Sequence, residues 1–164
     1  MKLNATSLLS LSTIAIATLF FASSCKKSNS SSGASGQLSA TVGANSFQPT
    51  LVVALDNQGH VGIAAIQVKN GDSLFMTVFV PDTAKAGQTV ALSTYGDGAI
   101  TYNNSTGTVT FDSFEADSHG TITVSSFDKT NKKVAGTFSG VLYSSINTDS
   151  VKVNGQFNTA YITQ

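Results

Sequence analysis

Short strand-like segments separated by turn residues fill the chain from Gln37 to Gln164. These segments are rich in Val, Ile, Thr, Phe and Tyr, and Gly, Asn and Asp bound them. No apolar repeat at helical spacing continues for more than about two turns. Such a pattern is typical of β-structure, so we expect one all-β domain. The expected strands are 37–43, 50–56, 60–69, 72–80, 88–93, 99–103, 107–114, 120–127, 133–143 and 150–162.

Turn signals predict how neighbouring strands connect. Asn70-Gly71 lies between two apolar segments and favours a two-residue type I′ hairpin, because both central positions of that turn need a positive φ. Similar turns are expected at Asp56–Gly59 and at Asp128–Asn131. Consecutive hairpins indicate an antiparallel meander. We expect the meander to form a β-sandwich, with a flattened up-and-down or lipocalin-like barrel as the alternative.

A repeated pattern marks the last quarter of the chain. Val134-x-Gly136-x-Phe138 recurs nineteen residues later as Val153-x-Gly155-x-Phe157, and the two copies are expected to be the arms of one hairpin. Glycine inside a strand costs packing and entropy, so it indicates a bulge, a bend, or backbone lying under an aromatic ring. Phe138 and Phe157 are the candidate rings.

The segment Ser73–Val80 is apolar on both alternating faces. Leu74, Met76 and Val78 occupy one face, and Phe75 and Phe79 occupy the other. This pattern predicts a central strand that is covered on both sides.

The N-terminus carries an export pattern. Lys2 precedes an apolar stretch of 15 residues, Leu8 to Ala22, which has the length of a signal-peptide core and is too short for a typical transmembrane helix. Ala22-Ser23-Ser24-Cys25 follows and resembles the lipobox of bacterial lipoproteins, although Ala22 stands where that motif most often has Leu. The resemblance implies that residues 1–24 are removed as a signal peptide and that Cys25 receives the lipid.

Residues 25–36 are expected to tether the domain to the membrane. Lys26 to Gly36 is rich in Ser and Gly and has no apolar pattern, so we expect a flexible linker before a single domain at 37–164. Surface-exported lipoproteins of the Bacteroidetes often carry acidic residues just after the cysteine, whereas the first acid here is Asp56. We therefore expect a lipid anchor in the outer membrane, on the periplasmic face.

Charge and cysteine content exclude several function classes. From Gln37 onward six Lys face nine acidic residues, and Arg is absent from the chain, so no basic surface for nucleic acid is predicted. Charged residues make up 11% of the chain, against about 25% in typical soluble domains, which predicts a neutral surface. Because Cys25 is the sole cysteine, no internal disulfide is expected.

No constellation of residues predicts catalysis, a metal or a cofactor. The two histidines are His60 and His119; a zinc site would need three or four ligands, and the best set would join His119, Asp117 and Glu115 to His60. Glu115, Asp117 and His119 are also the only candidates for the acid, base or nucleophile of a hydrolase. We interpret these residues as part of a polar turn, because Asp is favoured in turns. No Gly-x-Ser-x-Gly elbow precedes a helix.

Two tyrosines are the candidate ligand contacts. Tyr95 and Tyr102 flank a Gly- and Asn-rich loop and would provide aromatic faces on which a sugar ring can stack. The partners considered are therefore the membrane, through the N-terminal lipid, and a glycan, a small hydrophobic molecule or an envelope protein.

Four segments of the domain resemble a family of unknown function found in Bacteroidetes lipoproteins. The segments are Ala40–Phe47 (ATVGANSF), Gly120–Val124 (GTITV), Val134–Gly140 (VAGTFSG) and Val151–Asn158 (VKVNGQFN). The resemblance implies an all-β lipoprotein and carries over no catalytic residue. We therefore expect a non-enzymatic binding or envelope-structural module, with a lipocalin-like carrier and a hydrolase using Glu115, Asp117 and His119 as the alternatives.

Overall fold

The computed structural model describes residues 36–93 and 97–163. These residues form an all-β domain, as the sequence predicts. The predicted signal peptide, Cys25 and the predicted tether up to residue 35 lie outside the described residues. The strands are β1 (Gln37–Val42), β2 (Asn45–Phe47), β3 (Leu51–Asn57), β4 (His60–Lys69), β5 (Asp72–Pro81), β6 (Thr89–Ala91), β7 (Ala99–Asn104), β8 (Thr110–Asp112), β9 (His119–Asp128), β10 (Lys133–Ser144), β11 (Ser150–Ala160) and β12 (Ile162–Thr163).

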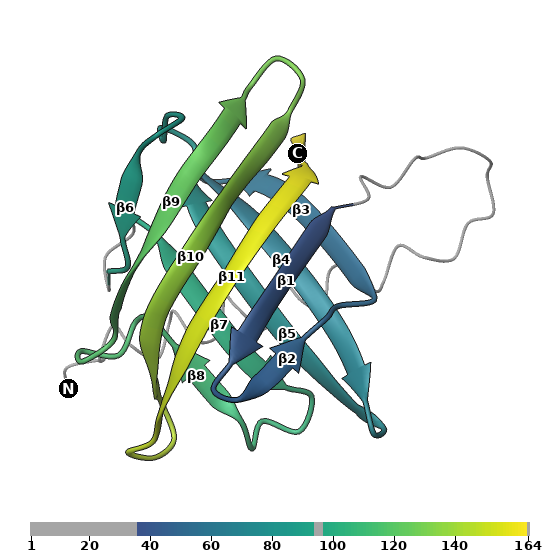
Figure 1. Cartoon of the computed structure of the whole chain (residues 1–164), viewed down its shortest axis with the longest axis vertical. Helices are drawn as coiled ribbons and strands as arrows, with labels where there is room; N and C mark the ends of the chain where they lie inside the picture. The colour runs from purple at the N-terminus through teal and green to yellow at the C-terminus, as the bar shows by residue number, and fades with distance from the viewer. Residues whose placement is uncertain (1–35, 94–96, 164) are drawn as a thin grey trace, which may run out of the picture. The chain divides into compact units, whose positions relative to one another are not determined.

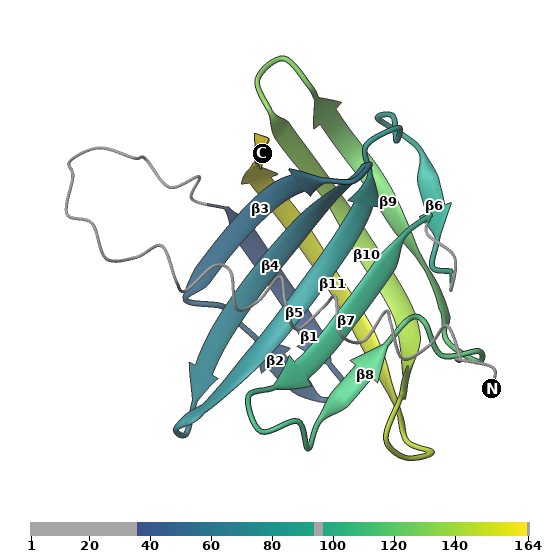
Figure 2. The same cartoon turned by 180° about the vertical axis from the view of Figure 1, so that it is seen from behind.

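The strands belong to one open, mostly antiparallel sheet that folds into two facing layers. One layer contains β9, β10, β11 and β1, and the other contains β3, β4, β5 and β7 (Figure 1, Figure 2). The short strand β8 pairs with both β7 and β10 and so joins the layers. Most strands pair with a strand that is next to them in the sequence, as in the expected meander. β6 departs from it by pairing with β9, and β12 departs by pairing parallel to β3.

Two of the expected hairpins have the predicted two-residue turns. Asn70 and Gly71 have φ angles of 54° and 82°, and the turn is flanked by the paired residues Lys69 and Asp72. The Gln58-Gly59 turn between β3 and β4 is of the same kind, with φ angles of 51° and 86°. Positive φ at both central positions is what a type I′ turn requires. The prediction of the Asn70-Gly71 hairpin is therefore confirmed.

The third hairpin, between β9 and β10, is held by an aspartate. Asp128 Oδ1 accepts hydrogen bonds from the backbone N–H groups of Thr130 and Asn131, both at 2.9 Å. Asp128 Oδ2 accepts a third from Asn131 Nδ2 at 2.7 Å. The backbone and side-chain bonds from Asn131 hold the pKa of Asp128 below its ordinary value of 3.8, because they favour the ionised carboxylate.

An Asp128→Asn substitution is expected to destabilise the domain at pH 7 and to do so less at low pH. A lowered folded-state pKa stabilises the native state above the ordinary value of 3.8, and this stabilisation is lost as pH falls through the folded-state pKa. Denaturant unfolding of both proteins at pH 7 and at about pH 2.5 measures the difference. A difference in unfolding free energy that stays constant with pH would contradict the assignment. In the control Asn131→Ala, the Asp128 pKa measured by NMR should rise towards 3.8.

The repeated Val-x-Gly-x-Phe segments form the two arms of the β10–β11 hairpin, as predicted. In the register Gly136 lies opposite Phe157, and Phe138 lies opposite Gly155. A Cβ atom on Gly136 would lie 2.7 Å from Phe157 Cζ, and one on Gly155 would lie 2.8 Å from Phe138 Cε1. Each glycine therefore lies under the ring of the opposite strand. The β9–β10 register also shifts between Ala135 and Gly136, which places a bulge beside the first glycine.

Apolar side chains from both layers fill the space between them. The largest fully buried ones include Ile122 and Leu142 from one layer and Ile63, Met76 and Ile100 from the other, and they belong to one continuous core cluster. No helix within residues 36–93 and 97–163 is long and apolar enough to cross a membrane.

The outer side of β5 differs from its predicted environment. β5 is a central strand, since it pairs with β4 and β7, and Met76 and Val78 are fully buried between the layers. Phe75 and Phe79 on the other side are only partly buried. The ring of Phe79 lies close to Gly62 of the neighbouring strand β4. The prediction that β5 is covered on both sides is therefore confirmed for its inner side, while its outer side is partly buried.

Candidate binding surfaces

The outer side of the layer containing β9, β10 and β11 carries two rows of uncharged, mostly polar residues. Residues paired across five strands form two parallel rows on this side. One row is Thr89, Thr123, Thr137, Gln156 and Ser39, and the other is Ala91, Thr121, Ser139, Asn154 and Thr41. Hydroxyl and amide groups thus repeat at the strand spacing of about 4.8 Å, without a charged residue in either row. We call these two rows the polar face.

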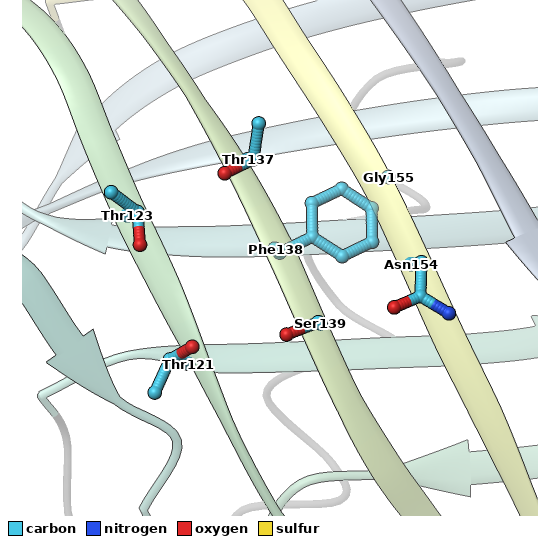
Figure 3. Close-up of a pocket in the computed structure, with 7 residues that line it drawn as sticks. All are labelled: Thr121, Thr123, Thr137, Phe138, Ser139, Asn154 and Gly155. Atoms are coloured by element: carbon cyan, nitrogen blue, oxygen red, sulfur yellow. The ribbon is translucent and has the colours of Figure 1, made fainter.

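A shallow depression lies on the polar face. Its lining includes the side chains of Thr121, Thr123, Thr137, Ser139 and Asn154 (Figure 3). The one aromatic residue in the lining is Phe138, whose side chain is buried in the core over Gly155. The depression therefore offers hydrogen-bonding groups to a neutral ligand and no aromatic face for a sugar ring to stack on.

The outer side of the other layer, onto which Figure 2 looks, is mostly apolar on β12, β3, β4 and β5, while β7 adds Ala99, Thr101 and Asn103. The strand register places its residues in three rows. Ile162, Leu55, Gly62 and Phe79 form the first row, Val53, Ala64 and Thr77 form the second, and Leu51, Ile66 and Phe75 form the third. Val68 extends this surface towards the β4–β5 turn. We call the apolar residues of this surface the apolar face: Leu51, Val53, Leu55, Ala64, Ile66, Val68, Phe75, Phe79 and Ile162.

The apolar face contains three of the four most exposed large hydrophobic residues among those described. Val68 is 59% exposed, Ile162 is 54% exposed and Leu51 is 49% exposed; the fourth, Ile146, lies in the β10–β11 turn. The charged residues nearest in the sequence, Lys69 among them, lie at the ends of the strands rather than between the rows. A contiguous apolar patch on an otherwise polar surface is a mark of an interaction site.

The three residues of the hydrolase alternative lie in the turn before β9 and at the first position of β9, without a catalytic arrangement. His119 Nδ1 lies 2.9 Å from the backbone carbonyl oxygen of Asp117, and this contact uses no carboxylate. Asp117 is exposed and Glu115 is partly exposed. The side chain of Ser118 is engaged in the turn, because its hydroxyl donates to the carbonyl of Asp112 and accepts from the N–H of Tyr143. The geometry is that of a hydrogen-bonded turn.

Asp112 organises the start of the same turn. Its Oδ1 accepts hydrogen bonds from the N–H groups of Phe114 at 2.9 Å and Glu115 at 3.2 Å. Burial raises the pKa of Asp112 from its ordinary value, and the two hydrogen bonds oppose this rise. The carboxyl group thus serves the backbone of the turn, and both of its recorded partners are main-chain groups.

Metal-ligating side chains do not gather anywhere in the described part of the chain. Within residues 36–93 and 97–163, no group of three or more His, Cys, Asp or Glu side chains could hold a metal ion. His60, at the start of β4, therefore does not join Glu115, Asp117 and His119 in a ligand set.

The predicted tyrosine platform is divided between the core and an undescribed segment. Tyr102 lies on β7 with its side chain in the core, only 9% exposed, and its ring contacts Phe47 edge to face, with 6.0 Å between the centroids. Burial also raises the pKa of the Tyr102 hydroxyl. So small an exposed area leaves no room for a sugar to stack. Tyr95 lies outside the described residues.

Sequence reasoning missed both candidate surfaces, although the signals for them were present. The polar face is visible as alternation in Thr121–Ser125 and in Asn154–Asn158. The apolar face is visible as the nearly continuous apolar segment Leu51–Leu55 together with Phe75 and Phe79. A single strand does not reveal which of its sides faces the other layer.

No protein-family model matches the chain, and neither a curated protein nor a solved structure matches it.

Proposed function

We propose that this protein is a lipid-anchored, non-enzymatic binding module of the bacterial cell envelope. The observation that carries the proposal is the apolar face. Sheets of a sandwich in water usually present polar side chains on their outer sides, and here one outer side does so while the other presents Leu51, Val68, Phe75 and their neighbours. Such a surface gains free energy when something apolar covers it.

The location follows from the N-terminal pattern. The signal-peptide core ending at Ala22, the lipobox-like Ser23-Ser24-Cys25 and the Ser- and Gly-rich segment up to Gly36 support export, lipidation and tethering. The absence of acidic residues directly after Cys25 favours the periplasmic face of the outer membrane. Membership of the Bacteroidetes lipoprotein family of unknown function is part of the same proposal.

Two alternatives receive less support from the geometry. A lipocalin-like carrier needs an apolar interior that is open to its ligand, whereas the interior here is filled by packed side chains such as Phe47, Met76 and Ile100. A hydrolase using Glu115, Asp117 and His119 needs an acid or base held beside a nucleophile, whereas these side chains belong to a partly exposed turn.

A Cys25→Ala substitution is expected to abolish lipid attachment and maturation. The thiol is the only group in the lipobox that can accept the diacylglyceryl group, so the variant should retain residues 1–24 and incorporate no labelled palmitate. Mass spectrometry of the purified chain and metabolic labelling measure both effects. The control Ser24→Ala keeps a small residue before the cysteine and should mature normally. A Cys25→Ala protein that still carries lipid would refute the anchoring proposal.

A further inference from the structure

We infer that the apolar face lies against the bilayer surface in which the lipid of Cys25 is inserted. This inference rests on the proposed lipid anchor and names the partner of the binding module. It also assigns the polar face to the opposite side of the sandwich, where it is directed away from the membrane.

The position of Gly36 brings the tether to β3, the strand whose outer side carries Leu51, Val53 and Leu55 of the apolar face. Gly36 is the first described residue, and a Cβ atom placed on it would lie 2.9 Å from Val52 Cγ1 and 2.6 Å from Thr159 Cβ. Val52 is the second residue of β3, and its two neighbours in the chain, Leu51 and Val53, point outward into the apolar face. The side chain of Val52 itself points into the core, so the chain that leads to the lipid enters the domain on the inner side of β3, whose outer side belongs to the apolar face.

The length of the tether keeps the apolar face close to the membrane. Eleven residues, 26–36, follow Cys25 before the first strand. They span at most about 40 Å when fully extended and roughly 17–20 Å on average for a Gly- and Ser-rich chain. A surface held at this distance meets the bilayer at a high effective concentration, so even a weak apolar interaction suffices for docking.

The area of the apolar face favours a membrane over a second copy of the chain. Three strands about 4.8 Å apart and about seven residues long, at about 3.4 Å per residue, give a footprint on the order of 350 Å². A stable protein–protein interface buries about 800 Å² on each partner. The footprint is too small for a stable dimer, whereas a tethered domain needs only a modest contact with the membrane.

The composition of the face suits the boundary between headgroups and acyl chains. Phe75, Phe79 and Ile66 present apolar groups at its centre, and no charged side chain would have to leave water there. Lys69 and Asp72 lie at one end of the β4–β5 hairpin, where they can remain in the headgroup region. Apolar surface at this boundary contributes to binding in proportion to the area that is buried.

Single tryptophans provide the test, because the chain contains none. Mature lipidated Phe75→Trp protein is reconstituted into vesicles of phosphatidylethanolamine and phosphatidylglycerol, with and without bromine on the acyl chains. Bromine quenches tryptophan only at close range, so emission from Phe75→Trp is expected to fall at least about two-fold in brominated vesicles. Val68→Trp is a second variant at the most exposed position of the face, and it should behave alike even if Phe75→Trp folds poorly.

The matched control is Thr137→Trp on the polar face, whose emission is expected to stay unchanged in brominated vesicles. Flotation of the vesicles in a density gradient measures separately whether the protein is attached to them through its lipid. Protein that floats while Phe75→Trp and Val68→Trp remain unquenched would overturn the docking inference and leave the lipid anchor standing. A blue shift that depends on protein concentration, without bromine quenching, would identify a second copy as the occupant and would also overturn it. Protein that does not float would overturn both proposals.

Discussion

A Gly155→Val substitution is expected to lower the free energy of unfolding by about 3 kcal/mol or more. A Cβ atom at this position would lie 2.6 Å from the backbone oxygen of Ser39 and 2.8 Å from Phe138 Cε1. Neither neighbour can yield easily, because Ser39 belongs to the adjacent strand β1 and the Phe138 ring is packed in the core. The overpacking must therefore push β1 or β10 away from β11.

Denaturant unfolding measured by circular dichroism checks this result. Gln156→Val is the matched control, because Gln156 is the next residue of the same strand and points into solvent. An exposed substitution of this kind usually changes stability by about 0.5 kcal/mol or less. Equal unfolding midpoints for Gly155→Val and Gln156→Val would show that the Phe138 ring does not lie over Gly155.

A Phe47→Ala substitution is expected to destabilise the domain by about 3–5 kcal/mol, the usual range for removing a core phenylalanine. Phe47 comes from the three-residue strand β2 and is 1% exposed. Its ring meets Tyr102 of the opposite layer edge to face, at an interplanar angle of 84°. Its removal leaves a cavity between the layers and removes this aromatic contact.

Chemical denaturation measures the loss, and near-ultraviolet circular dichroism reports the environment of the Tyr102 ring. The control is Ser46→Ala, one residue earlier on β2, whose side chain is exposed and whose hydroxyl accepts only a surface hydrogen bond from Gln48 Nε2. Phe47→Ala protein that is as stable as Ser46→Ala protein would mean that β2 does not close the core.

The strands could be predicted largely from the sequence because their signals are local. The segments 60–69 and 133–143 coincide with β4 and β10 to within one residue, since β-branched and aromatic residues alternate between flanking turns. β2 was not predicted. Three residues are too few to show a period, and Asn45 and Ser46 are typical turn residues.

The candidate surfaces were harder to predict, since each depends on what covers a strand. Phe75 and Met76 are adjacent apolar residues of β5, yet Met76 is fully buried between the layers and Phe75 faces outward. Tyr102 has a polar tip and flanks a Gly- and Asn-rich loop, as a ligand contact would, but it lies on the inner side of β7 against Phe47. Local pattern does not distinguish these cases.

The sequence by itself determined the all-β class, most strand positions, the Asn70-Gly71 turn and the pairing of the two Val-x-Gly-x-Phe segments in one hairpin, with Phe138 and Phe157 as the candidate rings over the glycines. These features depend on residues close together in the chain or on one hairpin. Only the tertiary structure decided that β1 pairs with β11, that β12 joins β3, and that the two outer sides of the sandwich are polar and apolar. Pairing between distant strands depends on the combined packing of many residues across two layers, and no single segment encodes that sum.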